Sequence, residues 1–254
     1  MKIPYFDAHC DTLSRMAYLP GAHLERRTGQ WDLEKLSRFD GPKAQIFAVF
    51  YDSALPGASR AAERQIAVFC RECERNQDRV VSCVDASQAE QAFADGKLAA
   101  FLSVEGAELL DCSVGKLDWA YARGVRFINL TWNHANALSG SHCDEPERGL
   151  SGQGRDFVRR MEQLGMLLDV SHLSDAGFWD LAECTNSPII ASHFNSRSVF
   201  FHTRNLTDEQ FTAIIKKNGI VGLNCYAAFL GEGSVTMDDL RRHLDHFLAL
   251  GGEE

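Results

Sequence analysis

The feature that most limits the fold of this sequence is a regular alternation of short apolar runs with amphipathic segments. The runs are rich in Val, Ile, Leu and Phe without strict apolar–polar alternation, which is typical of parallel strands covered by helices. Strands are expected at residues 3–9, 44–51, 99–105, 125–132, 166–172, 188–194 and 220–226. Helices are expected at residues 59–76, 87–95, 114–123, 152–164, 174–184 and 207–217, with a last one from Met237.

Repeated strand–helix alternation predicts a parallel α/β architecture, either an open doubly wound sheet or a closed (β/α)8 barrel. No linker, internal repeat or low-complexity segment interrupts the pattern, so we expect a single domain over residues 1–254. A closed barrel needs about eight strands, one more than the pattern contains. Because an open barrel would expose two strand edges, we expect the chain to be C-terminally incomplete, with its last strand missing.

Local signals predict some helix boundaries. Thr207 is a plausible N-cap, followed by Asp208 and Glu209 in the first turn. Gly124, Gly165 and Gly219 each precede an expected strand, the usual place of a helix C-cap.

The amino-acid composition excludes some classes of binding partner. The chain has 26 Lys and Arg against 35 Asp and Glu, a net charge of −9, which argues against nucleic acid or an anionic membrane. No apolar run approaches the roughly 18 residues of a membrane span, and the N-terminus has no secretory pattern. The eight scattered cysteines suit reduced thiols, so we expect a cytoplasmic protein.

Candidate metal ligands stand at or just after the carboxyl ends of four expected strands. His9 and Asp11 follow the first strand and are two positions apart, so they point to one face while Cys10 turns away. The other candidates are Glu105, His172 and His193, after the third, fifth and sixth strands. Barrel enzymes build their active sites at this end of the strands, and imidazole and carboxylate groups suit Zn²⁺ or a similar divalent metal.

Each of these residues alone has an ordinary structural explanation, but core histidines have no reason to gather with two carboxylates at one end of consecutive strands. Five ligands also exceed what one catalytic zinc takes, since that ion keeps a position for water. We therefore expect two ions. His9 and Asp11 would hold one, His172 and His193 would hold the other, and the catalytic Glu105 would bridge them. Such a pair supplies a hydroxide nucleophile and a Lewis acid for amide or ester hydrolysis.

Arg204 and the other histidines are less decisive. Arg204 lies eleven residues after His193 in the loop after the sixth strand, where it could clamp a substrate carboxylate. It could equally be a surface Arg that pairs with the acidic start of a helix. We expect three histidines to be solvated, and we leave two in polar loops undecided. The solvated ones are His23, His243 and His246, and the undecided ones are His142 and His202.

The motifs resemble the membrane dipeptidase (renal dipeptidase) family of zinc peptidases, as a bacterial-type soluble member. The matching stretches are FDAHCDTL, SVEGAE, GVRFINLTWN, GLSGQGRDFVRRMEQLGMLLDVSH, SHFNSRSVFFHTRN and IVGLN, in order over nearly the whole chain. The resemblance implies a (β/α)8 barrel of the metal-dependent hydrolase type that binds two zinc ions. It implies dipeptide hydrolysis by a bridging hydroxide, with C-terminal D-residues tolerated and β-lactams cleaved by some members. Dimers are common in the family, so a homodimer is one expectation.

Carried over by residue, the resemblance assigns the same ligand set and adds one role. His9 and Asp11 match the first-metal ligands, and Glu105 matches the bridge. His172 and His193 match the second-metal ligands. The spacing from His193 to Arg204 matches the Arg that binds the substrate carboxylate, which favours that role.

Two departures from the family pattern matter. Mammalian members have a His after the Leu-Thr of the fourth strand, which is thought to polarise the scissile carbonyl. Here that position is Trp132, with His134 two residues later, so either His134 substitutes or the zinc acts alone. The family also has a catalytic Asp in a Gly-Ser-Asp-Phe-Asp-Gly-like segment, and this chain stops just before that segment would come.

Two other functions remain open at this point. One is another binuclear amidohydrolase, such as a deacetylase, lactonase or phosphotriesterase. Those enzymes often bridge their metals with a carbamylated Lys, whereas the third strand here ends in Glu105. The other is an inactive metal-binding barrel that serves as a binding protein. The missing Asp favours it, and the complete ligand set with Arg204 argues against it.

Overall fold

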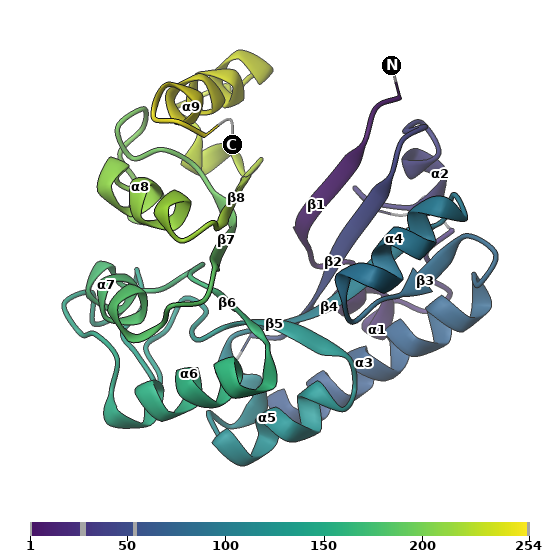
Figure 1. Cartoon of the computed structure of the whole chain (residues 1–254), viewed down its shortest axis with the longest axis horizontal. Coiled ribbons are helices and arrows are strands. Elements are labelled where there is room, and N and C mark those ends of the chain that lie inside the picture. The colour runs from purple at the N-terminus through teal and green to yellow at the C-terminus, as the bar shows by residue number, and fades with distance from the viewer. Residues whose placement is uncertain (1, 26–28, 53–54, 253–254) are drawn as a thin grey trace. The chain divides into compact units, whose positions relative to one another are not determined.

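The computed structural model of the chain describes residues 2–25, 29–52 and 55–252. The chain divides into two compact units, residues 1–128 and 129–254. In each unit, parallel strands alternate with helices (Figure 1). Among the described residues, no helix is long and apolar enough to span a membrane.

The first unit is built on a parallel sheet in which β2 and β4 pair over their whole length. Its strands are β1 (Tyr5–Cys10), β2 (Lys43–Phe50), β3 (Val80–Ser82), β4 (Leu98–Glu105) and β5 (Val125–Asn129). β1 pairs with β2, and β3 pairs with the beginning of β4. The register sets Phe50 opposite Glu105, so β2 and β4 end at the same level. The side chains of Phe47, Ala48 and Val49 in β2 are fully buried.

The helices of the first unit pack their apolar faces on this sheet. They are α1 (Thr12–Tyr18), α2 (Leu33–Leu36), α3 (Ala58–Arg75), α4 (Ala86–Ala94), the 3₁₀ turn η1 (Ala107–Leu110) and α5 (Val114–Tyr121). Helix α3 contacts β2, β3 and α1, and its buried face includes Ala62, Ile66 and Phe69. This spacing of apolar residues is that of an amphipathic helix on a core.

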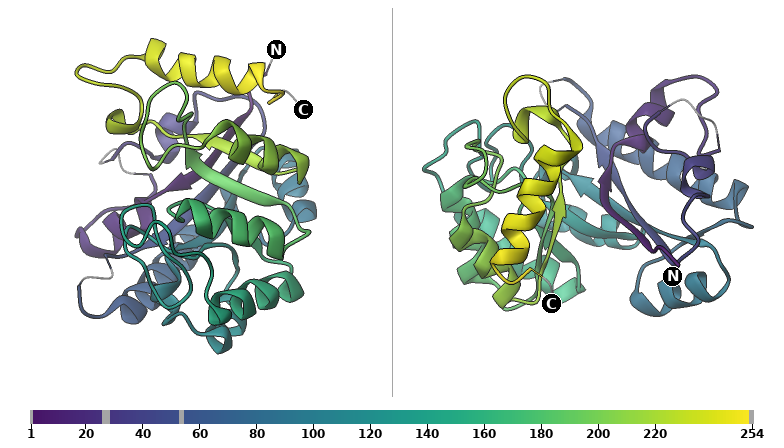
Figure 2. Two further views of the ribbon diagram at one scale, coloured as in Figure 1. Left: turned by 90° about the vertical axis from the view of Figure 1, so that its left-hand side faces the viewer. Right: turned by 90° about the horizontal axis from the view of Figure 1, so that it is seen from above.

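The second unit has a parallel sheet in the order β6 (Leu167–Asp169), β7 (Ile189–Phe194), β8 (Ile220–Leu223). Its helices are α6 (Gly152–Leu164), α7 (Asp175–Cys184), α8 (Asp208–Lys216), the 3₁₀ turn η2 (Ala227–Phe229) and α9 (Met237–Ala249). Helix α8 contacts β7 and β8, and α6 contacts β6 and α7. Helix α9, yellow in Figure 2, runs beside β8.

The expected strands and helices all have counterparts within a few residues, whereas the two 3₁₀ turns, one short strand and two short helices were not predicted. Strand β3 and helices α1 and α2 have three, seven and four residues, too few to give a periodic pattern. Thr207 is the N-cap of α8, as predicted. Its side chain accepts a hydrogen bond from Gln210 N at 3.2 Å, and its own N–H donates to Gln210 Oε1 at 2.9 Å.

The glycines before the strands act in two different ways. Gly165 ends α6 with a φ of 70°, a left-handed conformation that suits a residue without a Cβ, as predicted. After α8 the left-handed residue is Asn218, with a φ of 55°, so the C-cap role expected of Gly219 is wrong. Gly219 is required instead by close packing, because a Cβ there would lie 2.1 Å from the carbonyl oxygen of Ile189 in β7.

His243 was expected to be solvated, but it is fully buried on α9. Its Nδ1 accepts a hydrogen bond from the backbone N–H of Ser196 at 3.0 Å, so its Nε2 carries the proton and lies 3.2 Å from the carbonyl oxygen of Leu230. The neutral ring thus ties the loop after β7 to the end of η2. Burial lowers the pKa of His243 below its usual value of 6.5.

This burial predicts that His243 makes the fold sensitive to acid. The unfolded chain takes up a proton on this ring below about pH 6.5, whereas the folded chain resists it, so stability is lost as the pH falls. For one proton the slope approaches about 1.4 kcal/mol per pH unit. Urea unfolding of the wild-type chain and of His243→Gln, both with chelator present, should show their difference in stability shrinking from pH 7.5 towards acid. Parallel pH profiles would contradict this assignment.

Candidate metal centre

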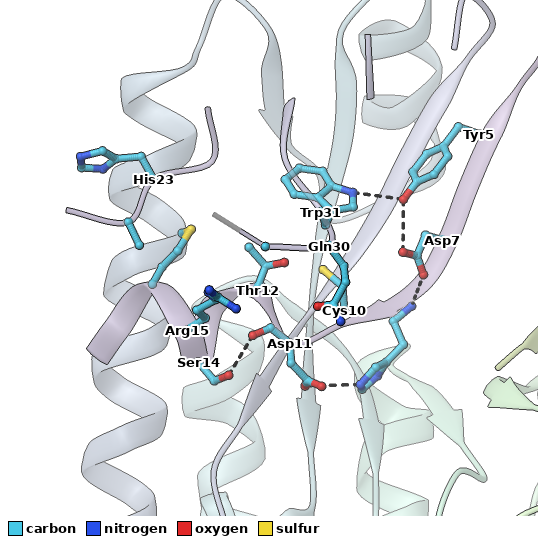
Figure 3. Close-up of a pocket in the computed structure, with 14 residues that line it drawn as sticks. Tyr5, Asp7, Cys10, Asp11, Thr12, Ser14, Arg15, His23, Gln30 and Trp31 are labelled. Carbon is cyan, nitrogen blue, oxygen red and sulfur yellow. Dashed lines mark hydrogen bonds and ion pairs between the residues drawn. The ribbon is translucent and has the colours of Figure 1, made fainter. Parts of the chain in front are cut away.

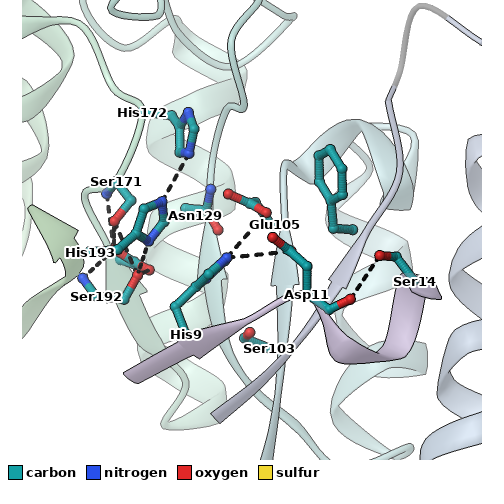
Figure 4. A network of polar contacts seen from close by, with 12 residues as sticks. His9, Asp11, Ser14, Ser103, Glu105, Asn129, Ser171, His172, Ser192 and His193 are labelled. Atoms are coloured by element: carbon teal, nitrogen blue, oxygen red, sulfur yellow. Dashed lines mark hydrogen bonds and ion pairs between the residues drawn. The ribbon is translucent and has the colours of Figure 1, made fainter. Parts of the chain in front are cut away.

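Three of the predicted ligands converge within the first unit. The Nε2 atom of His9 lies 3.5 Å from Asp11 Oδ1 and 3.5 Å from Glu105 Oε2 (Figure 4). His9 belongs to the end of β1, Glu105 is the last residue of β4, and Asp11 follows β1 directly. The side chain of Glu105 is 4% exposed and that of Asp11 is 54% exposed. The group therefore combines a buried carboxylate with one that solvent reaches.

The conformation of Asp11 indicates a role other than helix capping. Asp11 is the N-cap of α1, yet its side chain makes no capping hydrogen bond. Asp32 and Asp85, at the same position of α2 and α4, both accept a backbone N–H. The carboxylate of Asp11 is turned towards His9 instead. Two carboxylates around one imidazole, one of them buried, form a donor set that a divalent cation stabilises.

A chain of hydrogen bonds supports the backbone of His9, and Figure 3 shows three of its members, Asp7, Tyr5 and Trp31. The backbone N–H of His9 donates to Asp7 Oδ1 at 3.0 Å, and Asp7 Oδ2 lies 3.2 Å from the hydroxyl of Tyr5. Trp31 Nε1 donates to that hydroxyl oxygen at 3.1 Å. Burial, with the Asp7 carboxylate adding to it, raises the pKa of Tyr5, which keeps the phenol protonated. The pairing of β1 with β2 shifts register between Asp7 and Cys10, and Asp7 holds this irregular strand end in place.

These supporting residues line a hollow of about 590 Å³ in the first unit, together with Asp11, Arg15 and Gln30. Cys10 also lies in this hollow, between the two ligands in sequence. Burial raises the pKa of the Cys10 thiol to about 12. Without a bound metal, this thiol is therefore protonated.

The second unit brings together the other two predicted ligands. His193 lies in β7, and His172 follows β6 by three residues. Their Nε2 atoms are 3.0 Å apart (Figure 4). His172 has a φ of 70°, a left-handed conformation that is unusual for a residue other than Gly. Such strain is found where the surroundings hold a side chain in a functional orientation.

Hydrogen bonds behind the two rings decide where their protons lie. His172 Nδ1 is 3.0 Å from Asn133 Oδ1, and an amide oxygen only accepts, so Nδ1 of His172 carries the proton. His193 Nδ1 is 2.8 Å from Ser192 Oγ, whose single proton is donated to Asp169, so Nδ1 of His193 also carries the proton. With both rings neutral, each Nε2 carries a lone pair and faces the Nε2 of the other ring, 3.0 Å away. The repulsion between two such lone pairs is relieved by a proton on one of them or by a cation that both bind, so the pair fits a divalent metal.

Asp169 anchors this arrangement. It is 5% exposed, and its carboxylate accepts from Ser171 N at 2.9 Å, Ser171 Oγ at 2.7 Å and Ser192 N at 3.2 Å. A carboxylate behind a metal-ligating histidine raises the basicity of the ring and fixes its orientation. Here the hydroxyl of Ser192 stands between them. Asp169, Ser192 and Asn133 were missed in the sequence, although Asp169 and Ser192 are polar residues inside apolar strands, a signal that could have found them.

Arg204 is buried rather than on the surface, with 2% of its area exposed. Its guanidinium carbon lies 5.0 Å from the ring centre of Phe194 and 5.6 Å from that of Phe229. The acidic start of a helix is instead paired with Arg197, which holds Asp175 of α7 through two hydrogen bonds of 2.7 and 2.9 Å. Aromatic rings on a buried guanidinium restrict its orientation, as a bidentate carboxylate clamp requires.

The structure also shows which side chains surround Trp132, the position at which the sequence departs from the family pattern. The Trp132 ring lies 6.3 Å from that of His172 and 6.4 Å from that of His134, and His134 is exposed. His142, left undecided by the sequence, has its ring centre 5.7 Å from that of His172. Burial first, then the neighbouring Arg204 and His202, lowers the pKa of His142 to about 3, so this ring is neutral.

Comparison with known proteins identifies relatives of this chain. The chain is 28% identical to a metallo peptidase from Rhodobacter sphaeroides, crystallised with a phosphinate mimic of the dipeptide L-Ala-D-Ala, with a TM-score of 0.89 over 100% of this chain and 84% of that one. It is 29% identical to dipeptidase AC, a metallo peptidase of family M19, with a TM-score of 0.89 over 100% and 82% of the two chains. An uncharacterized Acinetobacter calcoaceticus protein, in the PQQ-III 3′ region, is 30% identical over 97% of this chain and 89% of its own.

These structural neighbours confirm the α/β fold class expected from the sequence, the parallel (β/α)8 barrel of metallo-dipeptidases. The sequence profile of the membrane dipeptidase family matches residues 1–254. The chain therefore belongs to the membrane dipeptidase family, peptidase family M19, and it is an enzyme of the metallo-dipeptidase type that uses a divalent metal.

Proposed function

We propose that this protein is a binuclear zinc dipeptidase that accepts dipeptides with a free C-terminal carboxylate. The observation that carries the proposal is the 3.0 Å approach of the Nε2 atoms of His172 and His193, whose Nδ1 atoms are bonded to Asn133 and Ser192. Membership in family M19 supplies the reaction class.

The five predicted ligands would hold two ions in this proposal. His9 and Asp11 would bind one, His172 and His193 would bind the other, and the catalytic Glu105 would bridge them, as the family resemblance implies. When bound, the zinc ions supply a water-derived nucleophile near neutral pH and a Lewis acid for the scissile carbonyl. The donor chemistry supports zinc, since imidazole nitrogens and carboxylate oxygens are its usual ligands besides thiolate.

Arg204 would bind the free carboxylate of the dipeptide. A carboxylate is the natural partner of a buried guanidinium, since two parallel hydrogen bonds satisfy its planar fork. Binding at this end makes chain length a selection criterion, because a longer peptide has no carboxylate at the required distance from the scissile bond. The L-Ala-D-Ala mimic bound by the Rhodobacter sphaeroides relative supports tolerance of a C-terminal D-residue.

We also propose that the two units form one catalytic domain and that the protein works in the cytoplasm, as a homodimer. Strand β5 runs from Val125 to Asn129 and so crosses the division between the units, and no linker-like segment separates them. The structure describes all eight cysteines without a disulfide among them, which supports a reducing compartment. The homodimer rests on the family resemblance alone.

The activity predicted by this proposal is metal-dependent and limited to dipeptides. Purified protein, extended by any residues that follow Glu254 in the natural chain, should cleave L,L- and L,D-dipeptides. A chelator should abolish the cleavage, and added Zn²⁺ should restore it. Tripeptides and N-acetyl amino acids should remain intact. Zinc-restored cleavage of N-acetyl amino acids or lactones instead would identify another amidohydrolase, and metal binding without any turnover would identify an inactive barrel.

Arg204→Met should lower kcat/KM for dipeptides by about 10- to 150-fold, the equivalent of losing one charge-assisted bidentate contact of roughly 1.5–3 kcal/mol. The loss should appear mainly in KM. A matched substrate provides the control, since a dipeptide amide has no carboxylate for Arg204 to bind. Cleavage of the amide should already be slow in the wild-type enzyme and should change little in the variant. Equal losses on both substrates would show that Arg204 acts through the fold rather than on the carboxylate.

A further inference from the structure

His142 connects His172, a predicted metal ligand, with the segment that carries Arg204. Among the contacts described for the second unit, it is the one residue that does so with side-chain hydrogen bonds at both ring nitrogens. Its Nε2 lies 3.0 Å from Asn133 Oδ1, and its Nδ1 lies 3.1 Å from Thr203 Oγ1. Asn133 Oδ1 is the same atom that lies 3.0 Å from His172 Nδ1. Thr203 directly precedes Arg204. The path therefore runs from a predicted metal ligand to the predicted substrate clamp.

The position of each proton along this path follows from which atoms can donate and which can only accept a hydrogen bond. The amide oxygen of Asn133 has two lone pairs and only accepts, so it takes one hydrogen bond from His172 Nδ1 and one from His142 Nε2. The neutral His142 ring then has no proton on Nδ1, which accepts from the hydroxyl of Thr203. Only the neutral ring of His142 can donate at Nε2 and accept at Nδ1 as these two links require. Its second bond keeps the Asn133 oxygen, rather than the amide nitrogen, turned towards His172.

The backbone reinforces the same connection. The N–H of His142 donates to the carbonyl oxygen of His172 at 3.0 Å, and the neighbouring Ser141 forms an isolated antiparallel bridge with Leu173. His172 is the residue with the left-handed φ of 70°. A strained conformation persists only where several contacts hold it, and His142 supplies one on the backbone and one through Asn133.

The segment around Arg204 is fixed at the other end of the path. The backbone N–H of Arg204 donates to His202 Nδ1 at 3.0 Å, and the His202 ring lies 4.5 Å from that of Phe229. Phe229 is also one of the two rings beside the Arg204 guanidinium. A shift of Thr203 would therefore disturb both the clamp and the hydrogen bond to His142.

We propose that His142 is a positioning residue for the dipeptidase reaction, which holds His172 with its Nε2 lone pair towards the metal and couples this ligand to the segment that binds the substrate carboxylate. The role of His142 in substrate binding rests on the proposed function. Its role in holding His172 rests on the contacts described within the second unit. Both ring nitrogens of His142 are engaged by protein groups, so its role is positioning rather than proton transfer.

The test compares zinc binding and kinetics in four variants. His142→Ala removes both links, and His142→Gln keeps a side-chain N–H that can donate to Asn133. Thr203→Val removes only the link to the Arg204 segment. His246→Ala is the matched control, because His246 is also a partly exposed histidine of the second unit, bonded to Asp208 at 2.8 Å. The readouts are chelator competition for each zinc equivalent, the visible spectrum of the Co²⁺-substituted protein, and kcat and KM for a dipeptide.

His142→Ala should weaken one of two zinc equivalents by about 10- to 100-fold and shift the Co²⁺ spectrum, as expected for the loss of a hydrogen-bond partner behind a ligand. His142→Gln should recover most of that affinity. Thr203→Val should raise KM while leaving zinc affinity near the wild-type value, and His246→Ala should match the wild type in all readouts.

The proposal is overturned if His142→Ala binds both equivalents like the wild type with an unchanged Co²⁺ spectrum. It is also overturned if His142→Gln is no better than His142→Ala, or if His246→Ala loses the same affinity, since those results describe a general loss of stability. A wild-type protein that binds zinc but cleaves no dipeptide would remove the proposed function, and the zinc comparison would still decide the role of His142 at the metal. A wild-type protein that binds no zinc would overturn both.

Discussion

The site depends on one electrostatic constraint, which is that the Nε2 atoms of two imidazoles, His172 and His193, are held 3.0 Å apart. With both rings neutral, their lone pairs repel each other, and the rings could relieve this by rotating or by moving the proton from Nδ1 to Nε2. Asn133 and Ser192 oppose both changes, because each accepts a hydrogen bond from Nδ1. The buried charge of Asp169 fixes the direction of the Ser192 hydroxyl. The fold therefore holds two nitrogen ligands at a distance that a divalent cation bound by both would stabilise.

The predicted ligands lie at strand ends because only there is the backbone free to hold side chains in unusual orientations. Inside a parallel strand the backbone groups are committed to the ladder and the side chains to the core, as for the buried residues of β2 and β4. At the carboxyl end the backbone is released, and irregular conformations become available. His9 lies at a register shift of β1, and His172 adopts a left-handed φ just past β6. Both irregularities are held by polar side chains, Asp7 and His142 with Asn133, rather than by packing.

The sequence predicted the parallel architecture and the ligand candidates because both depend on local patterns. Apolar runs report strands, and His9, Asp11, Glu105, His172 and His193 follow those runs directly. It failed where the reason is tertiary. His243 looks like a polar-face residue of α9 until Ser196 and Leu230 are seen on either side of its ring. Gly219 looks like a C-cap, yet it is needed because the Ile189 carbonyl of β7 approaches it.

Arg204 and His142 mark the limit of reasoning from spacing. Both lie in polar loops whose sequence gives no sign of burial, and a loop arginine is most often on the surface. Arg204 is instead packed against Phe194 and Phe229, and its charge helps to keep His142 neutral. A neutral His142 is what allows one nitrogen to donate to Asn133 while the other accepts from Thr203. Together with burial, the charge of Arg204 thus favours the neutral form of the ring that we propose positions His172, which is a physical reason for both residues to occur in one network.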